Sequence, residues 1–356
     1  MSPRRFLTSA VPALLLALAL PVSPLRAAPR PVVLSETGST LLYPLFNLWA
    51  ARYTRLVPAT RITTEGTGSG TGIAQAVSGL VTLGASDAYL SDFLARRHPN
   101  LLNIPLAISS QMVNYHLPHL DGRALRLSGP VLAAIYEGRI RRWNAPAIAA
   151  LNPGVPLPAH RIVVVHRSDG SGDTFIFTQY LTFTTPGWKQ RVGYGTTVNW
   201  PAVPGEIGAT GNPGMVEALH TTPYAIAYVG VSYASAIRRE HLGTARLENR
   251  AGRFVALTPA TVEAAARARV GSTPADERLS LVDAPGANAY PIVNYEYVMV
   301  RTHQPSARTA RALRRFLNWC LASREGSAPA FLDAVGFVRL PKAVRAISRH
   351  QIARIH

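Results

Sequence analysis

Residues 162–181 read IVVVHRSDGSGDTFIFTQYL, and this stretch decides how the rest of the sequence is interpreted. The β-branched run at 162–165 predicts a strand, and residues 176–181 predict the first turns of a helix. The small residues between them form a turn at the start of that helix, where the first backbone N–H groups have no partner within the helix. These N–H groups, the helix dipole and the guanidinium of Arg167 together favour an anion at this turn.

Two earlier segments have the same strand, turn and helix order. Residues 38–40 (GST) separate a predicted strand at 32–35 from an amphipathic helix at 45–53. Residues 66–72 (GTGSGTG) separate a strand at 60–64 from the next helix. Taken alone, the first of these turns is better explained as an ordinary N-cap. The three turns together predict a pocket lined by hydroxyl and backbone N–H groups.

The glycine-rich residues 66–72 do not fit the known nucleotide-binding or hydrolase motifs. A dinucleotide fingerprint that starts at Gly66 requires glycine where the chain has Thr71. A P-loop requires a Gly-Lys pair, and neither Lys189 nor Lys342 follows a glycine. A nucleophile elbow around Ser69 requires glycine where threonine stands at position 67. The ten histidines show no metal-ligand spacing. The sequence therefore argues against nucleotide hydrolysis and predicts no metal site.

The length and composition indicate two domains with a large core. The chain has 356 residues, of which 47% are hydrophobic and 16% are charged. Two long apolar strands, predicted within 104–115 and at 291–300, are interpreted as crossings between the domains. We therefore expect domain I to comprise residues 29–110 and 292–356, and domain II to comprise residues 111–291.

Residues 1–28 predict a cleaved secretory signal. A positively charged start precedes an apolar run at 11–20, which is too short to span a bilayer, and small residues follow it. A short membrane anchor is the alternative interpretation. The only cysteine is Cys320, which is expected to be buried on an amphipathic helix. An internal disulfide and a lipid-anchored cysteine at the signal junction are therefore excluded, and we expect an exported soluble protein.

The formal net charge is +18, and +15 once the three arginines of residues 1–28 are removed. Such basicity raises the possibility of nucleic-acid binding. The arginines, however, are scattered in small groups such as those within 139–142 and 311–315, and the chain has only two lysines. We therefore predict no nucleic-acid partner, although the charge can attract anions over a long range at low salt.

Two carboxylates, Asp87 and Asp173, are expected near the anion pocket. A carboxylate can accept a hydrogen bond only from an anion that still carries a proton. Phosphate carries one or two protons at neutral pH, whereas sulfate carries none. A carboxylate that faces sulfate would lose about 1–3 kcal/mol through unsatisfied groups. Asp87 therefore indicates selection for phosphate.

Several stretches together resemble one family, the periplasmic phosphate-binding proteins of the high-affinity phosphate ABC importer. The resemblance extends over about residues 31–345. The stretches that carry it are Gly38-Ser39-Thr40 with Tyr43-Pro44, Gly66 to Gly70, Gly84 to Ala88, Ile135 to Ile140 with Trp143, Arg167 to Phe175, Gly195 to Val198 and Ala227 to Val229. Residues 168–181 and 290–297 are especially similar to the mycobacterial members.

The resemblance implies an α/β, type II periplasmic-binding-protein fold, in which two mixed-sheet lobes are joined by two crossover strands. It implies that the hydroxyl groups of Thr40 and Ser69 and the backbone N–H of Leu41 bind phosphate. Asp87 would accept a phosphate proton. The full implied set of phosphate-binding residues is Thr40, Leu41, Ser69, Asp87, Arg167, Ser171, Gly172 and Asp173, with Asp169 supporting Arg167.

Two departures from the family pattern matter. Many members have threonine where Asp173 stands, whereas the mycobacterial type has aspartate. Asp173 is therefore either a second proton acceptor for phosphate or only a cap of the helix. The mycobacterial proteins also carry a lipidated cysteine at the signal junction, which this chain lacks. Its absence favours free diffusion in a Gram-negative periplasm.

The function implied by the resemblance is high-affinity phosphate binding in the periplasm, by hinged closure of two lobes, and delivery to an ABC permease. We expect a monomer that is not an enzyme and needs no cofactor. The alternatives are a binding protein for another tetrahedral oxyanion, such as sulfate, molybdate or arsenate, and an exported phosphatase. A phosphatase would need a nucleophile with a base or paired metals, which the sequence does not show. An adhesin or sensing role can coexist with phosphate binding.

Overall fold

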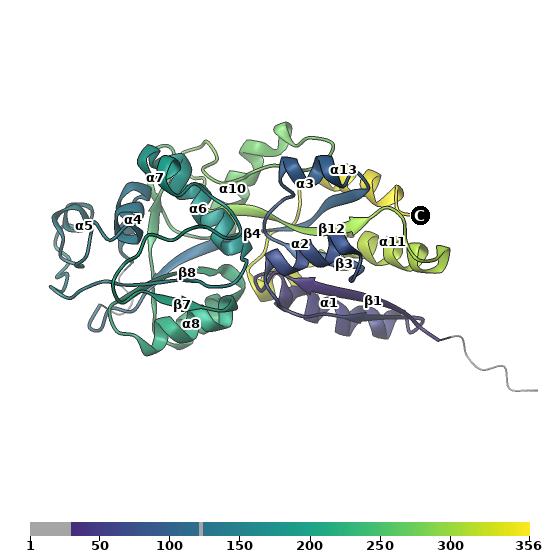
Figure 1. Ribbon diagram of the computed structural model, residues 1–356, viewed down its shortest axis with the longest axis horizontal. Coiled ribbons are helices and arrows are strands. Elements are labelled where there is room, and N and C mark those ends of the chain that lie inside the picture. Colours follow the sequence, from purple (N-terminus) through teal and green to yellow (C-terminus); the bar gives the residue numbers. More distant parts are fainter. Residues whose placement is uncertain (1–29, 121–123) are drawn as a thin grey trace, which may run out of the picture. The chain divides into compact units, whose positions relative to one another are not determined.

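The computed structural model describes residues 30–120 and 124–356, and the predicted signal at 1–28 lies outside them (Figure 1). The strands are β1 (Val32–Gly38), β2 (Thr60–Thr63), β3 (Leu83–Ser86), β4 (Leu101–Tyr115), β5 (Arg126–Leu127), β6 (Val163–Arg167), β7 (Ile207–Ala209), β8 (Ala225–Gly230), β9 (Gly243–Thr244), β10 (Arg246–Glu248), β11 (Phe254–Val255) and β12 (Val293–Arg301). The α-helices are α1 (Tyr43–Leu56), α2 (Ser69–Ser78), α3 (Asp92–Arg97), α4 (Gly129–Tyr136), α5 (Pro146–Leu151), α6 (Gly172–Thr184), α7 (Pro186–Arg191), α8 (Gly211–Thr221), α9 (Ala234–Arg239), α10 (Pro259–Arg269), α11 (Ala307–Leu321), α12 (Pro329–Leu332) and α13 (Lys342–Ala353). Short 3-10 turns occupy Val231–Tyr233, Val270–Ser272 and Asp333–Val335.

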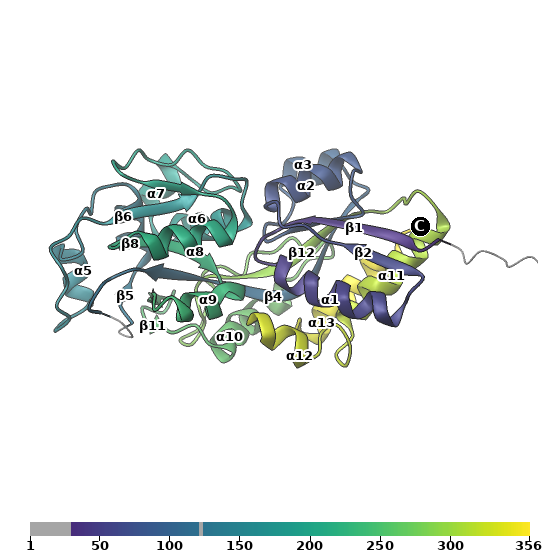
Figure 2. The same ribbon diagram turned by 90° about the horizontal axis from the view of Figure 1, so that it is seen from below.

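The main sheet is mixed and follows the order β2-β1-β3-β12-β4-β8-β6-β7, with β9 paired to β4. The long strand β4 connects its two halves, as Figure 2 shows. Residues 101–110 of β4 pair with β12, and residues 111–115 pair with β8. We call β1, β2, β3, β12 and the first part of β4 the first lobe. The last part of β4 with β6, β7, β8 and β9 forms the second lobe.

The return passage between the lobes comes just before β12. The strand expected at 291–300 is found at 293–301. Over this whole length it pairs with the first part of β4, and its residues 297–299 also pair with β3. The backbone N–H of Gln111 donates to the carbonyl oxygen of Ile292 at 3.0 Å, where β4 changes partner. The predicted domain boundaries at 110/111 and 291/292 stay a prediction, which this change of partner supports.

Helices pack against both lobes and bury the apolar residues that the sequence pattern indicated. Helix α1 has a proline in its first turn and buries Leu45, Phe46, Trp49 and Tyr53, which share one helix face. It packs on β2, while α2 packs on β1 and β3. Helices α6 and α8 pack on β8 (Figure 1). Cys320 is fully buried on α11, as predicted.

The predicted strand, turn and helix segments are confirmed at β1–α1, β2–α2 and β6–α6. The apolar pattern of the sequence also predicts a strand at 81–88 and helices at 128–140, 211–219, 258–269 and 307–323. The structure has each of these elements, with ends shifted by a few residues. The sequence analysis did not identify α3, α5, α7, α9 or the small sheet β11-β10-β5. These helices have six residues each and these strands two or three, which is too short for a clear periodicity.

Candidate functional site

The carboxyl ends of β1 and β6 carry two of the turns that the sequence singled out, and Asp87 follows the carboxyl end of β3. Because β1 and β3 are parallel neighbours, the turn after Gly38 and the residues after Ser86 lie at the same edge of the first lobe. Ligands of open α/β sheets bind outside the carboxyl ends of strands. We therefore place the candidate site at these three strand ends.

Arg167 is the last residue of β6, and two carboxylates hold its guanidinium. Nε and Nη2 donate to the two oxygens of Asp169 at 2.6 and 2.5 Å, and Nη1 donates to Oδ2 of Asp173 at 2.8 Å. Burial opposes the charge of Arg167, but the two carboxylates outweigh it and raise its pKa above the ordinary value. These bonds use three of the five N–H groups of a guanidinium, which leaves one on each terminal nitrogen for an anion.

Asp173 lies in the first turn of α6, and its carboxylate binds other side chains. Besides Arg167, Nδ2 of Asn212 donates to Oδ2 at 2.6 Å, and Nε2 of Gln111 donates to Oδ1 at 3.1 Å. The helix is capped instead by Ser171, whose Oγ accepts from a backbone N–H of the first turn. Burial raises the pKa of Asp173, although Arg167 acts in the opposite direction. Capping is therefore not supported, and contact of Asp173 with phosphate stays a prediction.

Asp87 follows β3 and is buried among hydroxyl groups. The hydroxyl of Ser39 donates to Oδ1, and the hydroxyl of Ser69 donates to Oδ2 at 3.4 Å. Gly172 of the second lobe lies against the same carboxyl group. A Cβ on Gly172 would be 2.3 Å from Oδ2 of Asp87 and 2.5 Å from Oγ of Ser69. Only glycine permits this approach between the two lobes.

A second buried carboxyl, that of Glu296, lies beside Asp87. The antiparallel register of β12 against β3 places Glu296 at the cross-strand position next to Asp87. Nδ2 of Asn294 donates to Oε1 of Glu296 at 2.9 Å and to the main-chain oxygen of Asp87 at 3.4 Å. Burial, and then the charges of Glu296 and Asp173, raise the pKa of Asp87 well above its usual range. Burial also raises the pKa of Glu296 to about 7.

Thr40 and Leu41 follow β1 and contact the second lobe. Oγ1 of Thr40 accepts from both the backbone N–H and Nδ2 of Asn212, each at 3.1 Å. The carbonyl oxygen of Leu41 accepts from the hydroxyl of Ser232 at 2.8 Å. The backbone N–H of Leu41, which the family resemblance assigns to phosphate, donates to Oγ of Ser39 at 3.1 Å in this structure.

The glycine-rich turn at 66–72 meets the turn at 166–175. The backbone N–H of Gly70 donates to the carbonyl oxygen of Gly170 at 2.8 Å. Gly68 has a φ of +93°, and a Cβ there would lie 2.5 Å from Oδ2 of Asp169. The structure therefore brings residues of all three predicted turns together. Three contacts connect these turns and their neighbours. Asp87 lies against Gly172, Thr40 accepts from Asn212, and the N–H of Gly70 donates to Gly170.

Four residues that the sequence did not mark complete this cluster: Ser39, Gln111, Asn212 and Glu296. Ser39 stands within a motif that was quoted, but its bond to Asp87 was not foreseen. Asn212 comes near because β7 pairs in parallel with β6, with Ala209 opposite Arg167, so α8 starts beside the guanidinium. No local signal marks these residues, because their roles depend on the pairing of strands far apart in the sequence.

Within residues 30–120 and 124–356, no group of three or more histidine, cysteine, aspartate or glutamate side chains could hold a metal ion. In the same part of the chain, no helix is long and apolar enough to span a membrane. The absence of a cofactor stays an expectation.

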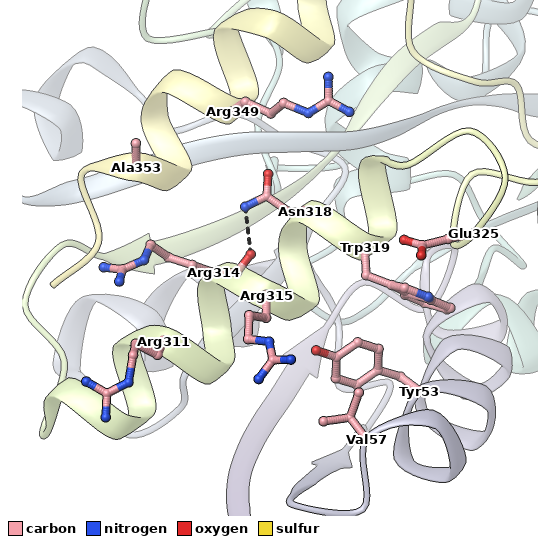
Figure 3. A pocket seen from close by; sticks show the side chains of 10 residues that line it. All are labelled: Tyr53, Val57, Arg311, Arg314, Arg315, Asn318, Trp319, Glu325, Arg349 and Ala353. Atoms are coloured by element: carbon pink, nitrogen blue, oxygen red, sulfur yellow. Dashed lines mark hydrogen bonds between the residues drawn. The ribbon is translucent and has the colours of Figure 1, made fainter.

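A separate basic groove lies on the first lobe, between α1, α11 and α13 (Figure 3). It has a volume of about 760 Å³. Arg311, Arg314, Arg315 and Arg349 line it, together with Tyr53, Val57, Asn318, Trp319, Glu325 and Ala353. None of the predicted phosphate-binding residues lines it. This groove therefore accounts for part of the positive charge without belonging to the site between the lobes.

The fold and the cluster between the lobes define a substrate-binding protein of the periplasmic-binding-protein class. Residues 26–325 match the family model described as a PBP superfamily domain. Among solved structures, the phosphate-binding protein from Stenotrophomonas maltophilia has a TM-score of 0.67 at 21% identity, covering 90% of this chain and 93% of that chain. A high-affinity periplasmic phosphate-binding protein solved with phosphate has a TM-score of 0.72 at 22% identity, covering 90% and 93%. The predicted two-lobed α/β fold is thereby confirmed.

The curated relatives identify the family within this class. The phosphate-binding protein PstS of Methanocaldococcus jannaschii is 35% identical over 345 residues, which cover 92% of this chain and 87% of that protein. PstS of Xylella fastidiosa is 34% identical, covering 88% and 82%. PstS3 of Mycobacterium bovis is 32% identical, covering 86% and 82%. The chain belongs to the PstS family of phosphate-binding proteins, as the sequence resemblance indicated.

Proposed function

We propose that this protein binds inorganic phosphate in the periplasm and delivers it to the permease of an ABC importer when its lobes open. The observation that carries the proposal is the contact of Asp87 and Ser69 of the first lobe with Gly172 of the second. This contact joins hydroxyl groups, a helix start and a buried guanidinium at one place. The named phosphate-binding relatives support the same ligand.

Apart from Asp173, the predicted residues have distinct tasks in this proposal. Arg167, fixed by Asp169, offers its two remaining N–H groups to phosphate oxygens. The hydroxyl groups of Thr40 and Ser69 add neutral donors, and the start of α6 at Ser171 and Gly172 adds backbone N–H groups. The backbone N–H of Leu41 joins these donors when the ligand replaces Ser39 as its partner. Asp87 accepts a hydrogen bond from a proton that phosphate carries.

Titration calorimetry with phosphate and sulfate at pH 7 tests this assignment. The wild-type protein is expected to bind phosphate and to reject sulfate, because sulfate has no proton to donate to Asp87. Equal affinity for the two anions would favour the broader alternative of a general oxyanion-binding protein. A wild-type protein that binds neither anion would contradict the proposal.

The variant Asp87→Asn removes the acceptor and is the sharper test. An asparagine amide can donate to a fully ionised oxygen, so the phosphate-to-sulfate affinity ratio should fall about tenfold. Asp92→Asn is the matched control, because Asp92 is an exposed carboxylate on α3 whose partner is Arg278. An unchanged ratio in Asp87→Asn would show that Asp87 does not select phosphate.

We further propose that the protein acts as a monomer, without a cofactor and without catalysis, after export through a cleaved signal and without a lipid anchor. Steady release of phosphate from a phosphomonoester would instead reveal the phosphatase alternative. Sedimentation equilibrium tests the oligomeric state. Mass measurement of protein isolated from the periplasm tests the signal cleavage and any lipid.

A further inference from the structure

Glu296 is a fully buried carboxyl group that has no role among the predicted phosphate contacts. Its Oε1 accepts from the hydroxyl of Ser109 and from Nδ2 of Asn294. Its Oε2 is buried and has no hydrogen-bond donor as a partner among the described residues. A buried carboxylate oxygen without a donor is costly, so a proton on a neighbouring group would stabilise it.

The group placed to supply this proton is the carboxyl of Asp87. Glu296 on β12 lies across from Asp87, which directly follows β3, and Asn294 bonds to both residues. Two carboxylates in contact in a dry site cannot both be ionised easily, so such a pair retains one proton. An O–H of Asp87 that donates to Glu296 gives Oε2 a hydrogen-bond donor. Such a retained proton agrees with the raised pKa of Asp87.

The other charged side chains around this pair already have partners of opposite charge. Asp173 on α6 faces both carboxyls, and its own charge is held by Arg167 of β6. Otherwise, the hydroxyl donors of Ser39 and Ser69 bond to Asp87, and that of Ser109 bonds to Glu296. The proton shared by the pair is therefore the adjustable charge in this part of the site.

We propose that Glu296 is a positioning residue that accepts a hydrogen bond from the protonated oxygen of Asp87 and so leaves the other oxygen of Asp87 to accept from phosphate. The shared proton limits the pair to one negative charge while phosphate is bound. When the pair loses this proton at high pH, a second negative charge appears beside the anion, and phosphate affinity falls. This inference rests on the proposed phosphate-binding function.

The test is the pH dependence of phosphate affinity, measured by calorimetry between pH 7 and 9.5. The wild-type affinity should fall about tenfold or more as the pair is deprotonated. In Glu296→Gln the pair keeps a single charge at all these pH values, so the affinity should stay nearly constant. Glu277→Gln is the matched control, because Glu277 is a buried glutamate whose carboxyl bonds instead to Ser348 and Gln351. It should retain the wild-type fall.

A wild-type affinity that does not change with pH, or a parallel fall in Glu296→Gln, would overturn the inference. If Glu296→Gln does not fold, carbon-13 NMR of labelled carboxyl groups in the phosphate-free wild-type protein gives an independent answer. One proton should remain on the pair at pH 7. If both carboxyl groups titrate independently with ordinary acidic pKa values, Asp87 and Glu296 do not share a proton. Because this measurement uses no phosphate, its failure is distinct from a failure of the wild-type protein to bind phosphate.

Discussion

Replacing Gly172 by alanine should prevent the two lobes from reaching the arrangement seen here. The Cβ of alanine would lie 2.3 Å from Oδ2 of Asp87, 2.5 Å from Oγ of Ser69 and 2.6 Å from Cβ of Asp87. Ordinary contacts begin at 3.4 Å, so these atoms would have to move apart by about 1 Å. They belong to short, buried side chains that have little freedom to move away.

The expected cost follows from this overlap. Overpacking of buried atoms costs about 1–3 kcal/mol. Because the overlap exists only when the lobes are together, this cost falls on the closed state, and phosphate affinity should decrease about 5-fold to 150-fold. The fold of each lobe should be unaffected, because alanine is compatible with the first turn of a helix.

Calorimetric titration with phosphate gives the affinity, and small-angle X-ray scattering shows whether phosphate still reduces the radius of gyration. Gly214→Ala is the matched control, because Gly214 also lies in the first turn of a helix, α8. A Cβ there would lie 3.7 Å from Cβ of Ala209, which is an ordinary contact. The control should bind phosphate like the wild type. If Gly172→Ala also binds with an affinity within about twofold of wild type, the close contact between the lobes is not part of the bound state.

Two further predictions concern residues that the sequence analysis did not assign. Asn212→Ala removes donors to Thr40 and Asp173, so phosphate affinity measured by calorimetry should fall about tenfold; an unchanged affinity would exclude this link between the lobes. Burial raises the pKa of Glu277 to about 8, so the folded state holds a proton that the unfolded state releases above about pH 4.5. The melting temperature of the wild type should therefore fall between pH 5 and 8, and calorimetric scans should show a smaller fall in Glu277→Gln; equal slopes would contradict this.

The parts of the fold that local sequence determines were predictable. The run at 162–165, the turn after it and the helix that follows each depend on neighbouring residues, so β6 and α6 were identified. The same reasoning identified the turns before α1 and α2. The three-stranded sheet of β5, β10 and β11 was missed, because strands of two or three residues are stabilised by distant partners rather than by their own pattern.

The site was predictable only in part for the same reason. Arg167 and Asp169 are two residues apart, so their pairing is local. Asn212 reaches Thr40 across 172 residues of sequence, and this contact depends on the parallel pairing of β6 and β7. Glu296 meets Asp87 only through the register of β12 against β3. Such registers are set by packing of the whole sheet, which one sequence does not reveal.

The charges around the site explain why a proton, rather than the guanidinium alone, governs anion binding. Arg167 supplies one positive charge, but the carboxylates of Asp169 and Asp173 already bond to it. If Asp87 and Glu296 were both ionised, two more negative charges would surround a bound anion. At an effective dielectric constant of about 20, one extra charge about 4 Å from an anion costs about 4 kcal/mol. The net positive charge of the whole chain offsets little of this, because salt screens it beyond about 8 Å. The affinity must therefore come from neutral N–H and hydroxyl donors, and the proton between Asp87 and Glu296 keeps the repulsion small enough for these donors to prevail.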